Sequence, residues 1–303
     1  MAFNPAVDDV YTFDAKHNPR VRDFFTLVLA LRKECFELVI TAGSSPVMAL
    51  LARLTGAPHR VGYATHRFTF LLTHAVPLNK QQYAAHMYHD LVGFLGKAPR
   101  PPQMTVPPSD RAWAEKFLES SQQQEKTQTV VIHPGVSKLS IQKNIIKGWA
   151  LENWIELARR LCASGKRVVL AGGPDDKEVI AALRSQLNTQ VIDASTATET
   201  LGQLAALIEA ADVLVAVDSA PMHVGVAVST PTVAVFGPTD PRKLLPSGSV
   251  HRPVQSGPLA CRPCLWDKRQ TSCEALTCLI EIPVEAVEDA LLKVLPPVVD
   301  GVQ

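Results

Sequence analysis

The second half of the chain alternates between short β-rich runs and longer amphipathic runs, and this pattern constrains the fold most strongly. Strands are predicted at residues 129–133, 167–171, 191–193, 213–217 and 232–236. Helices are predicted between them at residues 151–163, 176–187 and 200–210, with another starting at about Pro221. Regular alternation of strand and helix is typical of a parallel sheet covered by helices. We therefore expect an α/β protein with a Rossmann-like domain here.

The first half of the chain also alternates between predicted strands and helices, but less regularly. It predicts strands at residues 9–13, 37–41 and 60–63, and helices at residues 20–35, 46–54 and 83–95. The stretch PRPPQMTVPP then carries five prolines in ten residues, too many for a regular element. A helix at 109–121 and the polar stretch SQQQEKTQ follow. We therefore predict one domain over residues 1–126 and a second over 127–303, which ends in a terminal helix.

Charge and hydropathy exclude several classes of function. The 303 residues hold 30 basic and 29 acidic side chains, so the net charge of +1 predicts no nucleic-acid partner. No run approaches the roughly 18 apolar residues of a membrane span, and MAFNPAVDDVYTFD has no signal-peptide character. We expect a cytoplasmic protein. A Rossmann dehydrogenase is disfavoured because no Gly-x-Gly-x-x-Gly follows a predicted strand.

Polar and glycine residues follow the predicted strands of the second half. They include His133 with Gly135, the pair Gly172 and Gly173, the pair Asp218 and Ser219, and Thr239. Helix N-termini at this edge of a parallel sheet bind anions, so a phosphate-bearing ligand is predicted there. An alternative remains open, in which Asp218 or Ser219 only caps the helix that carries Pro221 and His223.

The order of these motifs is similar to that of a known family. HPG, KGW at Lys147 to Trp149, AGGPDD, VDSAPMH and PTVAVFGPTDP together resemble glycosyltransferase family 9, the ADP-heptose:lipopolysaccharide heptosyltransferases. In the first half NPAVDDV, FELVITAGSSPVMALLARLTGAPHRVGY and HMYHDLVGFLG resemble the acceptor-side domain of that family. The resemblance implies a GT-B-like fold of two Rossmann-like domains, with the nucleotide sugar on the C-terminal domain and the acceptor facing it.

The resemblance also implies a reaction and a set of site residues. The reaction is inverting transfer of heptose from ADP-heptose to the lipopolysaccharide inner core, without a metal, by a protein peripheral at the inner membrane. Lys147 would offset the charge that develops on the departing ADP. Ala220 stands where the family often has glycine. The implied nucleotide-sugar-binding residues are His133, Lys147, Gly172, Gly173, Asp218, Ser219, Ala220, His223 and Thr239.

The N-terminus departs from the family pattern. Family members begin with a strand and a loop whose Asp is the general base, and nothing in MAFNPAVDDV resembles that segment. Asp8 and Asp9 align with later family sequence, so neither is assigned as the base. We expect a truncated N-terminal domain that lacks at least one β-α-β unit. The alternative function is a catalytically silent nucleotide-sugar-binding protein.

The cysteines form two groups. Cys261, Cys264, Cys273 and Cys278 have the spacing C-x2-C-x8-C-x4-C, which is compatible with a structural zinc site. The alternative is a set of unligated thiols in a loop before the last helix. Cys35 and Cys162 lie in helical patterns and are predicted to be buried in the core.

Overall fold

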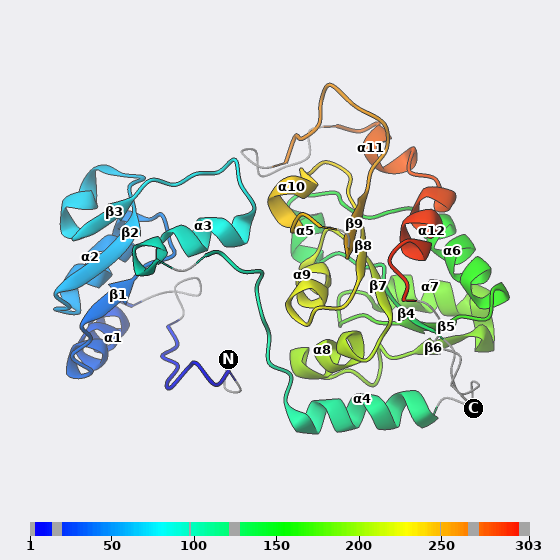
Figure 1. Ribbon diagram of the computed structural model, residues 1–303, viewed down its shortest axis with the longest axis horizontal. Coiled ribbons are helices and arrows are strands. Elements are labelled where there is room, and N and C mark those ends of the chain that lie inside the picture. Colours follow the sequence, from blue (N-terminus) through cyan, green and yellow to red (C-terminus); the bar gives the residue numbers. More distant parts are fainter. Residues whose placement is uncertain are drawn as a thin grey trace. The chain divides into compact units, whose positions relative to one another are not determined.

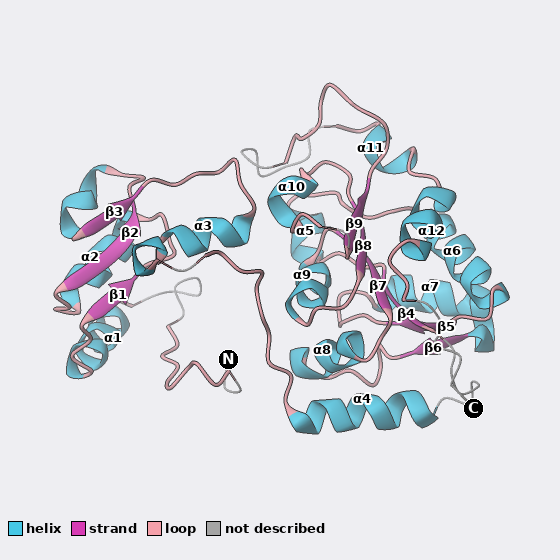
Figure 2. Cartoon of the chain, in the orientation of Figure 1, coloured by secondary structure: helices cyan, strands magenta, loops and turns pink. Residues whose placement is uncertain are grey.

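The computed structural model describes residues 4–13, 20–96, 98–120, 128–248, 250–265 and 273–296. It divides into two compact units, Met1–Arg100 and Pro101–Gln303, each built on one parallel sheet (Figures 1 and 2). The boundary falls at Arg100 and Pro101, not at 126–127, because helix α4 (Pro108–Ser120) packs on α8 (Leu201–Glu209). Arg111 of α4 donates two hydrogen bonds to Glu209 of α8, at 2.6 and 2.9 Å. The helix at 109–121 therefore belongs to the second unit.

The sheet of the second unit has six parallel strands in the order β6-β5-β4-β7-β8-β9. The strands are β4 (Thr129–His133), β5 (Arg167–Leu170), β6 (Val191–Asp193), β7 (Val213–Val217), β8 (Thr232–Val235) and β9 (His251–Val254). The direction of strand order reverses between β4 and β7, which is the position where Rossmann-type sheets bind ligands. The five strands predicted from the sequence are confirmed. β9 was missed because it contains Pro253, a residue that a strand tolerates at the edge of a sheet.

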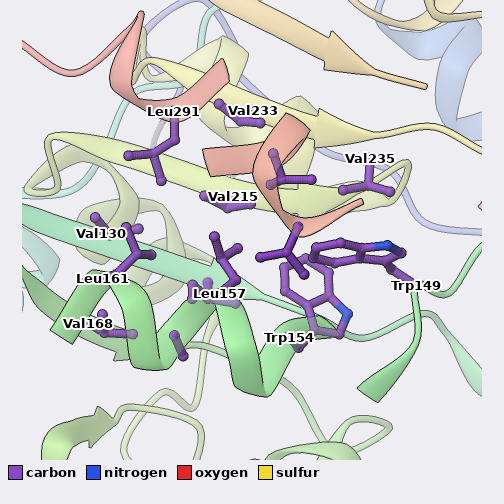
Figure 3. Close-up of a cluster of buried hydrophobic side chains, with 14 of the residues drawn as sticks. Val130, Trp149, Trp154, Leu157, Leu161, Val168, Val215, Val233, Val235 and Leu291 are labelled. Atoms are coloured by element: carbon purple, nitrogen blue, oxygen red, sulfur yellow. The ribbon is translucent and has the colours of Figure 1, made fainter. Parts of the chain in front are cut away.

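Helices cover both faces of this sheet. One face carries α6 (Leu151–Ala163), α7 (Lys177–Leu187) and α12 (Val284–Leu292), and the other carries α4, α8 and α9 (Ala220–Ala227). Figure 3 shows the first of these two cores, where Leu157 of α6 and Leu291 of α12 face the valines of the central strands. The rings of Trp149 and Trp154 meet there edge to face, with centroids 5.0 Å apart. Three short helices, α5 (Lys138–Gln142), α10 (Pro241–Leu244) and α11 (Thr277–Ile280), and one 3-10 turn, η3 (Asn188–Gln190), complete the described part of the unit.

The first unit has three parallel strands in the order β1-β2-β3. They are β1 (Leu38–Ile40), β2 (His59–Tyr63) and β3 (His74–Val76). The helices are α1 (Val21–Lys33), α2 (Pro46–Leu54) and α3 (Ala84–Asp90), with 3-10 turns η1 (Arg67–Leu71) and η2 (Gly93–Leu95). Its described core is small, and α1 exposes Val21, Phe25 and Leu29 on one stripe.

Two predictions for the first unit are wrong in detail. Residues 9–13 form no strand, because no other described strand pairs with them; the Tyr11 hydroxyl instead donates to Glu34, the C-cap residue of α1, at 2.6 Å, and Phe13 packs on Phe24. The helix predicted at 83–95 ends at Asp90 and continues as η2, which Gly96 closes at φ 70°.

The two helical cysteines also differ from the core positions predicted for them. Cys35 is exposed, because it lies beyond the end of α1 at φ 51°. Cys162 is half-buried and packs against the first core from its edge, and its thiol donates to the Gln190 carbonyl.

Within the residues described, no helix combines the length and apolar character that crossing a membrane requires.

Candidate functional site

A cavity of about 650 Å³ lies in the second unit, at the carboxyl edge of its sheet. The loops after β4, β5 and β7 and the start of α8 line it, so it occupies the point where the strand order reverses. Eight of the nine predicted nucleotide-sugar residues line the cavity, namely His133, Lys147, Gly172, Gly173, Asp218, Ser219, Ala220 and His223. Thr239 is buried and does not line the cavity, but its hydroxyl donates a hydrogen bond to Asp218, which does.

Asp218 is the centre of a buried hydrogen-bonded group. Its Oδ2 lies 2.8 Å from the Lys147 ammonium nitrogen and accepts a hydrogen bond from the Thr239 hydroxyl at 2.7 Å. Only 4% of the Asp218 side chain is exposed, which strengthens its attraction to Lys147 because little water screens the pair. Asp218 therefore fixes the direction of the Lys147 side chain toward the cavity.

The capping interpretation of this joint is wrong. Ser219 is the N-cap residue of α9, yet its side chain makes no cap hydrogen bond and instead donates to the Val217 carbonyl at 3.3 Å. Asp218 is engaged by Lys147 and Thr239. Neither side chain closes the first turn of α9, and Pro221 has no N–H to satisfy. The start of α9 is thus left open to a ligand.

The other two long helices that begin at the cavity differ from α9. At α8 a capping box joins Thr200 and Gln203. At α7 the N-cap residue Asp176 makes no cap hydrogen bond, but its carboxylate brings negative charge to this helix start and accepts the Gly173 N–H at 2.7 Å. At α9 the Lys147 cation lies close by, so among these described helices α9 is the most favourable for an anion.

His223 lies in the same helix and lines the cavity. Burial lowers the pKa of this imidazole, and the nearby Lys147 charge lowers it further, while Asp218 opposes both. The ring is therefore neutral at pH 7 and can donate one hydrogen bond to a phosphate oxygen without carrying a charge.

Asp176 is a site residue that the sequence analysis missed. Its Oδ2 also lies 3.5 Å from Nε2 of His133, whose pKa is lowered by burial. A Cβ on Gly135 would fall 1.7 Å from its Oδ1, and a Cβ on Gly172 would fall 3.0 Å from its Cβ. Gly135 and Gly172 leave space for the Asp176 side chain because they have no Cβ, and the Gly173 N–H already donates to its carboxylate. The sequence feature that could have identified it is the acidic pair Asp175-Asp176, which directly follows a Gly-Gly-Pro turn.

The four clustered cysteines lie near one another, beside the loop that carries Thr239. Burial raises the pKa of the Cys278 thiol, and the charges of Cys264, Cys261 and Cys273 raise it further. The Cys264 and Leu265 N–H groups both donate to the Pro238 carbonyl. No three His, Cys, Asp or Glu side chains among the described residues are arranged to hold a metal ion. The structural zinc stays a prediction.

Elemental analysis tests the zinc directly. Protein purified without chelators is expected to contain about one zinc per chain, because four thiolates are the full ligand set of a structural site. A Cys264→Ser/Cys278→Ser variant is the matched control and should lose the metal. Zinc content well below one per chain in the unmodified protein would leave the cysteines as unligated thiols.

The fold and the cavity define a class of protein. A Rossmann sheet with a cavity where its strand order reverses, in one chain with a second parallel α/β unit, is the architecture of GT-B glycosyltransferases. The chain belongs to glycosyltransferase family 9. Residues 24–274 match the family described as glycosyltransferase family 9 (heptosyltransferase).

Individual relatives agree with this assignment. Lipopolysaccharide heptosyltransferase 3 of Escherichia coli is 27% identical over 251 residues, covering 79% of this chain and 72% of that protein. Lipopolysaccharide heptosyltransferase 2 of E. coli strain K12 is 30% identical over 229 residues, 70% of this chain and 63% of that protein.

Solved structures share the fold. The family 9 glycosyl transferase of Veillonella parvula has a TM-score of 0.76 and 22% identity, covering 97% of this chain and 84% of that one. E. coli ADP-heptose lipopolysaccharide heptosyltransferase II has a TM-score of 0.67 and 23% identity, covering 90% and 81%.

Proposed function

We propose that this chain binds ADP-heptose in the cavity of its second unit and transfers the heptose, with inversion, to the lipopolysaccharide inner core. The observation that carries the proposal is the open start of α9 with Lys147 and His223 beside it. The names of the similar proteins support ADP-heptose as the donor and lipopolysaccharide as the acceptor. Because that acceptor is anchored in a membrane, the proposal places the protein peripherally at the inner membrane.

The proposed roles follow from charge and hydrogen bonding. The diphosphate lies at the start of α9, where Ser219 and Ala220 bring the backbone close to it. Lys147 neutralises the negative charge that grows on ADP as the glycosidic bond breaks, so transfer needs no metal. His223 donates a hydrogen bond to the diphosphate. Asp218 holds Lys147 in place and has a second carboxylate oxygen for a sugar hydroxyl.

A second candidate function is nucleotide-sugar binding without transfer. A general base for the acceptor hydroxyl would lie at the carboxyl ends of the strands of the first unit. The described loops there, at residues 41–45, 64–66 and 77–83, carry no Asp or Glu. Without a positioned base, transfer loses roughly 10²–10⁴-fold in rate. For the described residues, this is the observation in favour of the second candidate.

Calorimetry and a transfer assay test the two candidates together. Wild-type chain is expected to bind ADP, and His223→Ala to bind it about 10-fold more weakly, since one hydrogen bond to a charged group is lost. His86→Ala, in α3 of the first unit, is the matched control. No ADP binding would refute both candidates, whereas binding without heptose transfer from ADP-heptose would select the second.

A further inference from the structure

Thr239 is the predicted nucleotide-sugar residue that does not line the cavity. The residue is 3% exposed, so it lies behind the cavity wall. Its hydroxyl donates to Oδ2 of Asp218 at 2.7 Å, and the same oxygen lies 2.8 Å from the Lys147 ammonium nitrogen. Thr239 would therefore influence a ligand in the cavity through Asp218 and Lys147, without touching it.

The fold fixes the position of the Thr239 hydroxyl. Asp218 directly follows β7, Thr239 lies in the loop after β8, and these two strands are neighbours in the sheet. The preceding carbonyl, that of Pro238, accepts the N–H groups of Cys264 and Leu265 at 3.0 and 3.2 Å. The loop is thus tied to the segment after β9, and the hydroxyl is held at one place beside the carboxylate.

The Lys147 side chain needs a fixed partner more than Thr239 does. It is long and 22% exposed, so holding it in one direction costs conformational entropy. With Lys147 as its partner and no hydroxyl beside it, the Asp218 carboxylate could turn together with the lysine. The short Thr239 side chain adds a donor to Oδ2 that does not move with Lys147.

We infer that Thr239 is a positioning residue, whose hydroxyl holds the Asp218 carboxylate and through it the Lys147 ammonium in the direction of the diphosphate. The inference rests on the proposed function for the identity of the ligand. The contacts among the three side chains do not depend on that ligand, so the positioning can be measured without it.

Lysine acetylation measures the positioning in the free protein. Brief treatment with acetic anhydride, followed by peptide mass spectrometry, gives the rate at Lys147, with the exposed Lys116 as an internal reference. Thr239→Val removes the hydroxyl and keeps the side-chain shape. Lys147 should then react at least about 5-fold faster, the factor that corresponds to the loss of one hydrogen bond, because the released amine reaches the reagent more often.

Two further variants separate the hydroxyl from the packing. Thr239→Ser keeps the donor and should restore a rate close to that of wild type. Thr232→Val is the matched control, because it removes a fully buried hydroxyl in β8 that donates to the Thr230 carbonyl at 2.8 Å, away from the cavity lining. It should leave the Lys147 rate unchanged.

A double-mutant cycle on ADP affinity tests the consequence for the ligand. By calorimetry, Thr239→Val should bind ADP about 5-fold more weakly than wild type, since Lys147 no longer points steadily at the diphosphate. In the Lys147→Ala background the same substitution should have no further effect, because no cation is left to position. A general loosening of the cavity would weaken binding equally in both backgrounds.

The inference is overturned if Thr239→Val leaves the Lys147 rate unchanged, if Thr232→Val raises it equally, or if the two effects on ADP affinity add. Should Thr239→Val not fold, Thr239→Ala replaces it, and failure of both to fold would assign the hydroxyl to the fold and overturn the inference. Wild type that binds no ADP would refute the proposed function, and the acetylation rates would then decide the inference by themselves.

Discussion

Replacing Lys147 by alanine is expected to lower heptosyl transfer by about 10²–10³-fold, the loss typical when one group that stabilises charge in a transition state is removed. Lys147 is the cation within 2.8 Å of Asp218 at the cavity, beside the start of α9. Negative charge grows on the departing ADP, so the loss should appear mainly in kcat, with a smaller rise in KM. Steady-state kinetics with ADP-heptose and a core acceptor measure both.

Lys116→Ala is the matched control for this experiment. Lys116 is exposed on α4 of the same unit and does not line the cavity, so its replacement by alanine should change neither kcat nor KM. If the chain binds ADP without transferring heptose, the Lys147→Ala effect is read in the dissociation constant of ADP instead. If kcat, KM and the dissociation constant of ADP were the same for Lys147→Ala and wild type, another cation would neutralise the diphosphate.

Truncating Leu157 to alanine is expected to destabilise the second unit by about 2–5 kcal/mol, because it removes a buried side chain and leaves a cavity. Leu157 is fully buried in the core shown in Figure 3, between α6 and the central strands. Leu292→Ala in α12 makes the same chemical change at a side chain that is 56% exposed. It should shift stability by no more than about 0.5 kcal/mol.

Urea unfolding followed by tryptophan fluorescence measures this pair of variants. All four tryptophans lie beyond residue 101, so the signal reports the second unit. The midpoint should fall for Leu157→Ala while the slope stays unchanged. Equal midpoints for the two leucine variants would contradict the assignment of Leu157 to the core.

Much of the fold was predictable because strands and helices leave local periodic patterns in the sequence. α2, α6, β4, β6 and β7 begin and end at the predicted residues, since glycine, proline and charged residues mark their limits. The failures lie where local pattern is weak. β3 was not predicted, because its sequence His-Ala-Val has one β-branched residue and two of its three residues are exposed. Residues 9–13 alternate like a strand but have no strand partner in the described chain.

The sequence by itself determined the α/β class, the parallel strands of the second unit, the family, and eight of the residues that line the cavity. Only the tertiary structure decided to which unit α4 belongs and which groups the carboxylates of Asp218 and Asp176 contact. The reason is physical. A carboxylate's role depends on its partners, and those of Asp218 are Lys147 and Thr239, which lie far from it along the chain and meet it only when the sheet forms. Asp176 likewise bonds to the adjacent Gly173 loop, yet its burial depends on Gly135 and His133 at the end of another strand.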